Sequence, residues 1–304
     1  SASDVDGDLL ADLAVYRPAE SRWYVRKSTD LQVHTAALGS TGARAANHSR
    51  TVTTDRRAAL DLNGDRITDL GVVRRDSTNR LRFLLATGTP AVHPSASILL
   101  GSAPASVVHG DYDGDGRSDF GAVYPEDGYL VWRFLRSGDQ SLRRTELLVT
   151  YGLQGDQVLN ADFDADRITD LAVVRNMPSG LKLWLPNNSG NQPLEPVSWG
   201  FNSDTALTAD IDGDGKSDYI VVRQLGNELM WLVRTARGEA LPVRMYGFVG
   251  DELAPGDYNG DGRAELAVIR IISGGKLVIP DGLAPFYWGL AGDTSLTGHY
   301  AGTQ

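Results

Sequence analysis

Apolar residues occur along the whole chain in short runs that are bounded by Gly, Asn, Asp and Ser. Many of the runs are rich in β-branched residues, and others, such as 131–137, 181–187 and 229–235, contain Trp. Short runs of this composition between turn residues are typical of β-strands. Because no segment has the spacing of an amphipathic helix, the pattern predicts an all-β fold.

One polar and apolar unit recurs six times in the 304 residues. It reads Asp-x-Asp/Asn-Gly-Asp-x-x-x-Asp, with an occasional Ala or Glu replacement, and continues into a β-branched run. Successive copies begin 57, 50, 51, 48 and 47 residues apart. The copies are residues 4–17, 61–74, 111–124, 162–175, 210–223 and 257–270. A period of this length indicates a fold that is built from one repeated unit.

Each unit also contains further strand-like pieces. One example has an apolar run at 205–210, the β-branched run after its acidic loop, an aromatic run at 229–235 and an aromatic-Gly turn at 245–251. Four short strands repeated around a ring are the blades of a β-propeller. The sequence therefore predicts one domain over residues 1–304, a six-bladed β-propeller of four-stranded blades.

The two ends of the chain complement one another. The N-terminus starts at an acidic loop without the strand that should precede it, and the C-terminus ends shortly after such a strand. We expect the spare strand near Thr294–Gly298 to pair with the run Asp12–Arg17. Blade one is then built from residues 1–50 plus 287–304, and the ring is closed with no free sheet edge at the seam.

The acidic loops have the composition of a cation site. Carboxylates at positions 1, 3, 5 and 9 of nine residues repel one another unless a cation neutralises them. Calcium takes about six to eight oxygen ligands and fits these side chains together with the carbonyl of position 7, whereas magnesium keeps fewer protein ligands. We therefore predict up to six calcium ions, one for each loop.

The predicted ligands are Asp4, Asp6, Asp8, Leu10 and Asp12; Asp61, Asn63, Asp65, Ile67 and Asp69; Asp111, Asp113, Asp115, Arg117 and Asp119; Asp162, Asp164, Asp166, Ile168 and Asp170; Asp210, Asp212, Asp214, Lys216 and Asp218; and Asp257, Asn259, Asp261, Arg263 and Glu265. Position 6 is Gly only at Gly116, Gly215 and Gly262. We expect weaker binding by the less regular loops 4–12, 61–69 and 162–170.

These loops, with GDYNGDGRAELAVIR at 256–270 and WGLAGDTSLTG at 288–298, resemble the FG-GAP/VCBS repeats of integrin α-subunit heads and of many exported bacterial proteins. The resemblance covers essentially the whole chain. It implies a calcium-binding propeller that is secreted or lies at the cell surface. Members of this group more often have seven blades than the six counted here. The repeat also occurs in adhesion heads, lectins and scaffolds of polysaccharide lyases, so the resemblance leaves the function open.

Composition excludes several classes of partner and of catalytic chemistry. The formal net charge of −10 argues against nucleic acid as a partner. The absence of Cys excludes disulfides and thiol catalysis. No apolar run has the ~18 residues of a membrane-spanning helix, so we expect no membrane insertion. Because residue 1 is Ser, we expect a processed or trimmed part of a larger exported protein.

We do not expect an enzyme, because no catalytic motif is present and the five His residues have no catalytic spacing. A polysaccharide lyase or hydrolase, using a pair of the Asp residues, stays as an alternative. The first hypothesis is an extracellular adhesion module that recognises a glycan through rim loops such as 39–52 and 86–97, and a cell-surface protein is the alternative ligand.

The aromatic residues divide into two groups. Those of the third strands share one face, and we expect them to pack between blades. They are Trp23, Trp132, Phe134, Trp184 and Trp231. A second group lies at or near the Gly residues of the turns, closer to a rim, where a sugar could stack, although packing is again the alternative. These glycan candidates are Trp199, Trp288, Tyr151 and Tyr246.

An acidic residue and an arginine recur at fixed places in most units. The Asp lies six residues before the acidic loop, and the Arg lies nineteen residues after that Asp. Because the strands on either side of the loop are antiparallel, we expect the two side chains to meet at the end remote from the loop. The predicted ion pairs are Asp293–Arg17, Asp55–Arg74, Asp156–Arg175, Asp204–Arg223 and Asp251–Arg270, while the third unit has Ala105 and Tyr124 instead.

Overall fold

The computed structural model describes residues 13–17, 19–27, 32–37, 44–45, 70–75, 80–86, 96–102, 106–135, 146–259, 261–290 and 294–295. Within these ranges it contains twenty-four β-strands and no helix. The all-β prediction is confirmed. The predicted recognition stretches 39–52 and 86–97 lie almost entirely outside the described residues.

The described strands pair into six antiparallel sheets of four strands. Five sheets use strands that are consecutive in the chain: β4 (Arg44–Ala45), β5 (Leu70–Arg75), β6 (Arg80–Ala86) and β7 (Ala96–Ser102); β8 (Ser106–Gly110), β9 (Asp119–Glu126), β10 (Tyr129–Leu135) and β11 (Glu146–Leu153); β12 (Gln157–Ala161), β13 (Asp170–Asn176), β14 (Leu181–Asn187) and β15 (Val197–Phe201); β16 (Thr205–Ala209), β17 (Asp218–Leu225), β18 (Glu228–Arg234) and β19 (Arg244–Phe248); and β20 (Glu252–Leu253), β21 (Ala267–Ile272), β22 (Gly275–Pro280) and β23 (Phe286–Leu290).

The remaining sheet is composite. It consists of β1 (Leu13–Arg17), β2 (Arg22–Arg26), β3 (Val33–Ala37) and, from the other end of the chain, β24 (Thr294–Ser295). β24 pairs with β1 through Val15 with Ser295 and Tyr16 with Thr294. The sequence predicts six blades, with blade one built from both ends of the chain. The described residues give five contiguous blades and one sheet that is shared by both ends.

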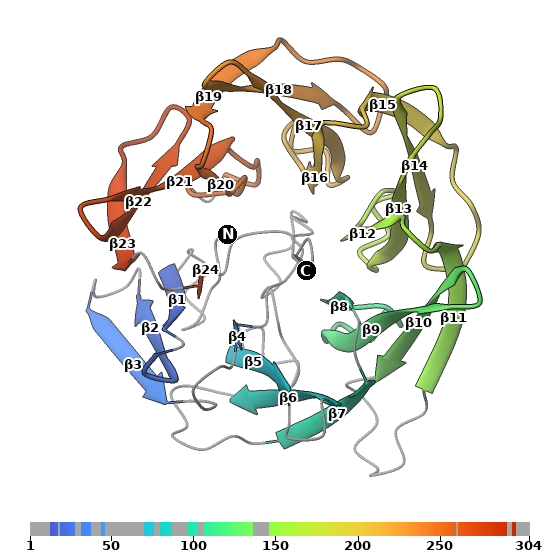
Figure 1. Ribbon diagram of the computed structural model, residues 1–304, viewed down its shortest axis with the longest axis horizontal. Coiled ribbons are helices and arrows are strands. Elements are labelled where there is room, and N and C mark those ends of the chain that lie inside the picture. The colour runs from blue at the N-terminus through green and yellow to red at the C-terminus, as the bar shows by residue number, and fades with distance from the viewer. Residues whose placement is uncertain are drawn as a thin grey trace.

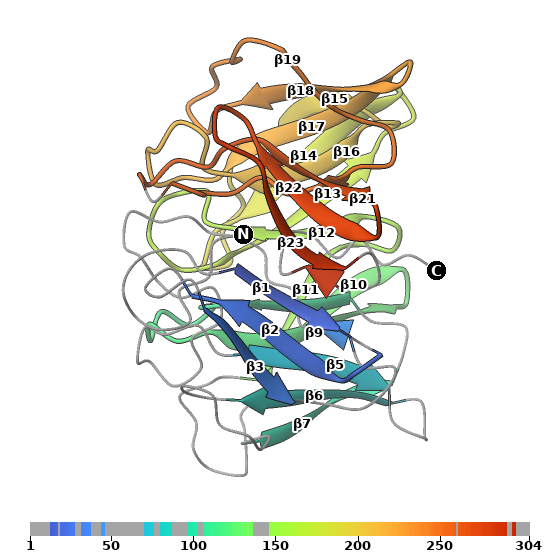
Figure 2. The ribbon, with the colours of Figure 1, turned by 90° about the vertical axis from the view of Figure 1, so that its left-hand side faces the viewer.

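The sheets stand around a ring in chain order, as Figure 1 shows. Strands such as β8, β12 and β16 lie innermost, and strands such as β3, β7 and β11 lie outermost. In the side view of Figure 2 the strands run across the thickness of the disc. This arrangement is a β-propeller.

The second strand of each blade is central in its sheet, and its β-branched run is covered on both faces. Residues 170–174 and 218–222 are buried without interruption. The third strand alternates instead, with the pattern exposed, buried, half-buried, buried along β18. Its buried positions include the Trp residues, since Trp23, Trp132 and Trp231 are 0% exposed. The predicted packing role of these Trp residues is confirmed.

Two of these Trp side chains, Trp132 and Trp231, also pack against the next blade. Trp132 shares a core cluster with Leu171 and Val173 of β13. Trp231 shares a second one with Leu266, which precedes β21, and Val268 within it. The hydrophobic core therefore lies between neighbouring blades, and each blade needs its neighbour to bury its aromatic face.

Three of the predicted Asp–Arg pairs are present at the ends of their hairpins. In the pair of Arg223 and Asp204, Nε lies 2.8 Å from Oδ1 and a terminal nitrogen lies 2.8 Å from Oδ2. Arg175–Asp156 and Arg270–Asp251 have the same bidentate geometry. These predictions are confirmed, while Asp293–Arg17 and Asp55–Arg74 involve residues outside the described ranges.

The aspartate of each pair also fixes the aromatic-Gly turn. Asp204 Oδ2 accepts a hydrogen bond of 2.7 Å from the backbone N–H of Phe201. Gly200 within this turn has φ +88°, and a Cβ there would lie 2.6 Å from Val221 of the adjacent strand. The turn therefore requires Gly both for its left-handed backbone and for the close approach to β17.

Candidate metal sites

Four of the acidic loops lie within the described residues, at 111–119, 162–170, 210–218 and 257–265, except for residue 260. Each loop joins the first strand of a blade to the second, so the four loops lie on one face of the disc. The predicted ligands of loops 4–12 and 61–69 lie outside the described residues.

Backbone hydrogen bonds to the carboxylates fold each loop. In loop 162–170, Asp162 accepts hydrogen bonds from the N–H of Ala165 (2.6 Å) and of Arg167 (2.9 Å). Asp170 accepts one of 2.7 Å from the N–H of Phe163, which joins the end of the loop to its beginning. Asp164 accepts one of 3.2 Å from the N–H of Asp166. The pattern turns the carboxylates toward a common centre.

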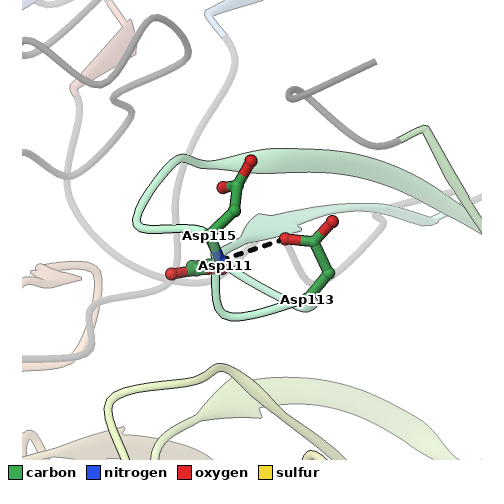
Figure 3. Close-up of side chains that lie close together, drawn as sticks. All are labelled: Asp111, Asp113 and Asp115. Atoms are coloured by element: carbon green, nitrogen blue, oxygen red, sulfur yellow. Dashed lines mark hydrogen bonds between the residues drawn. The ribbon is translucent and has the colours of Figure 1, made fainter.

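The same pattern recurs in the other loops. In Figure 3 the carboxylates of Asp111, Asp113 and Asp115 project from one tight turn, and Asp113 accepts the hydrogen bond of 3.2 Å from the N–H of Asp115. Oxygen atoms of these three residues lie within 4.8 Å of one another. The other described groups of this kind are Asp162, Asp164 and Asp170; Asp210, Asp212 and Asp218; and Asp257, Asp261 and Glu265.

The position-5 carboxylates do not all join these groups. Asp166 accepts a hydrogen bond of 2.5 Å from the Ser189 hydroxyl, and Asp214 lies 2.9 Å from Nε of Arg237. Ser189 and Arg237 follow the third strands of their blades. The sequence does not reveal these partners, because the connections that carry them differ in composition from one blade to the next.

The described loops fit a hard cation. Asp162, Asp170, Asp210 and Asp218 are 0% exposed, and one buried oxygen of Asp170, Oδ1, has no hydrogen-bond partner. Buried carboxylates at this spacing must be neutralised, either by protons or by a cation. Carboxylate and carbonyl oxygens are the ligands of calcium and magnesium rather than of softer metals. A bound ion would supply the missing positive charge. That the backbone carbonyl of position 7 is also a ligand stays a prediction.

The pKa values of these carboxyl groups show the cost of burying negative charges close together. Burial raises the pKa of Asp170 to about 8 and that of Asp218 to about 7, although backbone hydrogen bonds oppose the increase. Burial likewise raises the pKa of Asp162 and of Asp210 to about 6, and the neighbouring carboxylates add to it. Without a cation these groups therefore hold protons in the pH range where free Asp does not.

Comparison with known proteins agrees with this geometry. The FG-GAP-like repeat family matches residues 61–122, 162–221 and 210–268, which is more than half of the chain. The chain belongs to the FG-GAP-like repeat family. The matched segments include five of the six acidic loops in full, at 61–69, 111–119, 162–170, 210–218 and 257–265, so the family assignment and the acidic loops rest on the same residues.

Two curated relatives of this FG-GAP chain carry the same name. T-cell immunomodulatory protein of Rattus norvegicus is 31% identical over 130 residues, which cover 39% of this chain and 20% of that protein. The Mus musculus protein gives the same values. The matched region thus spans about a fifth of these relatives. A solved structure, BBS1N in complex with ARL6DN, soaked with lead, covers 77% of this chain and 81% of its own at 11% identity with a TM-score of 0.36, too low to carry an argument.

The rim aromatic residues of the FG-GAP repeats connect neighbouring blades. The Tyr151 hydroxyl donates to the carbonyl of Leu185 (2.9 Å), and the Tyr246 hydroxyl donates to that of Ile279 (3.0 Å). Trp199 Nε1 lies 3.4 Å from the carbonyl of Leu232. This placement favours the packing alternative for all three, while the side chain of Trp288 lies outside the described part.

No helix able to cross a membrane is found in the residues searched.

Loop 162–170 has left-handed backbone at residues other than Gly. Substitution at position 4 should therefore change the free energy of unfolding in opposite directions in loops 162–170 and 210–218. Ala165 has φ +66° and Arg167 has φ +72°, whereas the matching position-4 residue of loop 210–218 is Gly213. Because a side chain costs about 1 kcal/mol in this region, Ala165→Gly should raise the free energy of unfolding by about that amount. Gly213→Ala is the matched control and should lower it; urea unfolding measures both. A stabilised Gly213→Ala would contradict the prediction.

The raised pKa values predict how stability without metal depends on pH. The folded protein binds more protons at these Asp residues than the unfolded chain, whose Asp pKa is near 3.8. The stability that these raised pKa values contribute is thus complete below the pKa of the unfolded chain. It is lost as the pH rises through about 6 to about 8. In EDTA we expect a lower melting temperature at pH 8 than at pH 5. With excess calcium the difference should shrink or reverse, and a melting temperature in EDTA that rises with pH would refute the assignment.

Proposed function

We propose that the chain is a calcium-stabilised extracellular binding module that recognises a partner protein through the face opposite the acidic loops. Calcium supplies the charge that the buried carboxylates lack and stiffens the disc. The composite sheet of β24 and β1–β3 acts as the sixth blade and closes the ring, so that residues 1–304 form one domain.

Exposed apolar residues on one face carry this proposal. In each blade the acidic loop lies at the start of the second strand, and the hairpin to the third strand lies at its end. The hairpins therefore lie on the other face of the disc, beside the ends of the fourth strands, as in the pairing of Leu181 with Phe201. Four consecutive blades contribute Tyr129 (53%), Leu153 (40%), Leu181 (38%), Phe201 (49%), Leu225 (57%), Phe248 (42%), Ile271 (59%) and Leu290 (50%), where each value is the exposed fraction.

A protein partner suits this face better than a glycan. Exposed apolar residues on one face are typical of protein–protein contact. Two arginines lie over exposed aromatic rings of this face in cation–π contacts. The guanidinium carbon of Arg223 lies 4.1 Å from the ring centre of Phe201. That of Arg270 lies 4.6 Å from the ring centre of Phe248. Arg and aromatic residues are enriched in protein interfaces. The described candidates for sugar stacking are instead engaged between blades.

The relatives support a role outside the cell. T-cell immunomodulatory protein is named for an action on cells of the immune system, and FG-GAP propellers are typical of extracellular proteins. The glycan alternative and the polysaccharide-degrading alternative are retained as outcomes of the test, since neither requires the apolar face.

The experiment presents the calcium-loaded chain to an array of extracellular proteins and to a glycan array, beside a spectrophotometric lyase assay. We expect protein binding that Leu225→Asp and Ile271→Asp abolish. Met245→Asp and Tyr287→Asp, which change exposed residues of the outer strands β19 and β23, are the matched controls and should bind normally. Binding to glycans alone, turnover of a polysaccharide, or binding that survives both face variants would overturn the proposal, as would the absence of any signal.

A further inference from the structure

Neighbouring acidic loops are joined by backbone hydrogen bonds that run from blade to blade. The N–H of Ser217, at position 8 of loop 210–218, donates to the carbonyl of Asp162, at position 1 of the preceding loop (2.7 Å). Thr169 donates in the same way to Asp111 (2.6 Å), and Ala264 donates to Asp210 (2.7 Å). The four described loops therefore form one continuous chain of hydrogen bonds along the face of the disc.

Side chains also interlock between the loops. Arg263, at position 7 of loop 257–265, packs over Gly213 of the preceding loop, where a Cβ would lie 2.8 Å from its Cγ. Ile168 packs over Gly114 in the equivalent way, with a corresponding distance of 2.9 Å from Cδ1. Gly114 and Gly213 are therefore restricted by the next loop as well as by their own left-handed backbone, whereas loop 162–170 has Ala165 at this position.

Each link ends next to predicted ligands on both sides. The acceptor carbonyl belongs to the position-1 aspartate, whose carboxylate is a predicted ligand. The donor N–H lies between position 7 and position 9, which are also predicted ligands. An ion that holds the position-1 residue of one loop therefore fixes the acceptor that orients positions 7 to 9 of the next.

We propose that cation binding is cooperative between neighbouring loops and that the bond from position 8 to position 1 carries the coupling. This inference rests on the proposed calcium function. When one loop is ordered by its ion, the adjacent loop loses less conformational entropy on binding its own. Since coupling is reciprocal, the effect passes in both directions along the chain of loops. It is strongest between adjacent loops, because each link joins only two of them.

Glycine amides can report each loop separately. The N–H groups of Gly116, Gly215 and Gly262, at position 6, donate to the position-1 carboxylates of their own loops (2.9, 2.9 and 3.0 Å). In the chain labelled with nitrogen-15 at glycine, their NMR shifts give one calcium midpoint for each of three loops. Gly116 lies two loops away from loop 210–218, whereas Gly262 lies in the adjacent loop.

The decisive variant is Asp212→Asn, which weakens loop 210–218 but keeps an oxygen to accept the hydrogen bond from the N–H of Asp214. We expect the calcium midpoint of Gly262 to rise about fivefold or more and that of Gly116 to change much less. Glu228→Gln, which removes one exposed charge from the opposite face, should change neither. If Asp212→Asn does not fold, Asp261→Asn with Gly215 as the reporter tests the same link in the other direction.

The outcomes separate the two proposals. If both reporters respond to calcium in the unchanged chain but Gly262 keeps its midpoint in Asp212→Asn, the coupling is refuted and calcium binding stands. An equal change at Gly116 and Gly262 would also refute coupling between neighbours, because it would indicate a general loss of affinity. If none of the glycine reporters responds to calcium, both proposals fail.

Discussion

Chelation with EDTA should lower the melting temperature of the chain by more than about 10 °C. An ion that binds only the folded protein stabilises it by about 2.7 kcal/mol for each site when the free ion is at 100 times its dissociation constant. Several such sites act together in the acidic loops. Because about 1 kcal/mol corresponds to roughly 2–4 °C in a chain of this size class, the summed effect is large.

Readdition of the metal provides the control for chelation. Calcium should restore the melting temperature better than magnesium, since magnesium keeps more of its water ligands and demands stricter geometry. A variant with Asp210→Asn and Asp218→Asn should be less sensitive to EDTA than the unchanged chain. Identical melting curves with and without EDTA at pH 8 would contradict the metal assignment.

Arg223→Ala is expected to cost about 3 kcal/mol of unfolding free energy. Its partner Asp204 has a side chain that is 0% exposed, and Arg223 itself is only 26% exposed. Burial raises the pKa of Asp204, but the hydrogen bonds from Arg223 and from the N–H of Phe201 outweigh it, so the pKa lies below its usual value. Removal of the guanidinium leaves a buried charge without its partner.

Two further variants show whether the geometry matters. Arg223→Lys keeps the charge but loses the bidentate contact, so we expect an intermediate loss in urea unfolding. Glu126→Gln affects the exposed pair with Arg133, whose side chains are 44% and 42% exposed, and should change stability by less than about 1 kcal/mol. Equal effects of Arg223→Ala and Glu126→Gln would contradict a structural role for the buried pair.

Features that repeat within one blade could be predicted from the sequence. The β-branched runs define the central strands, the acidic spacing defines the loops, and the joint presence of Asp204 and Arg223 at a fixed interval predicts their contact. All of these depend on the local antiparallel pairing of consecutive strands. In the third unit Ala105 and Tyr124 replace both the Asp and the Arg. This joint replacement also indicates that the two positions contact one another.

The packing of Trp side chains between blades could be predicted from the sequence, but the hydrogen bonds that join two blades could not. The sequence does not reveal that the Tyr151 hydroxyl reaches the carbonyl of Leu185, or that Ser217 donates to the carbonyl of Asp162. Backbone carbonyl acceptors leave no mark on composition. The contact of Arg237 with Asp214 was missed because its connection has no counterpart of the same sequence in other blades.

The most direct test is crystallographic, with crystals grown in calcium chloride and an anomalous difference map calculated for calcium. We predict one peak within each of the loops 111–119, 162–170, 210–218 and 257–265, with oxygen ligands at about 2.3–2.6 Å. Position 1 and position 9 carboxylates, such as Asp210 and Asp218, should be among those ligands. A map with no peak at any of these loops, from crystals that retain the same fold, would contradict the assignment.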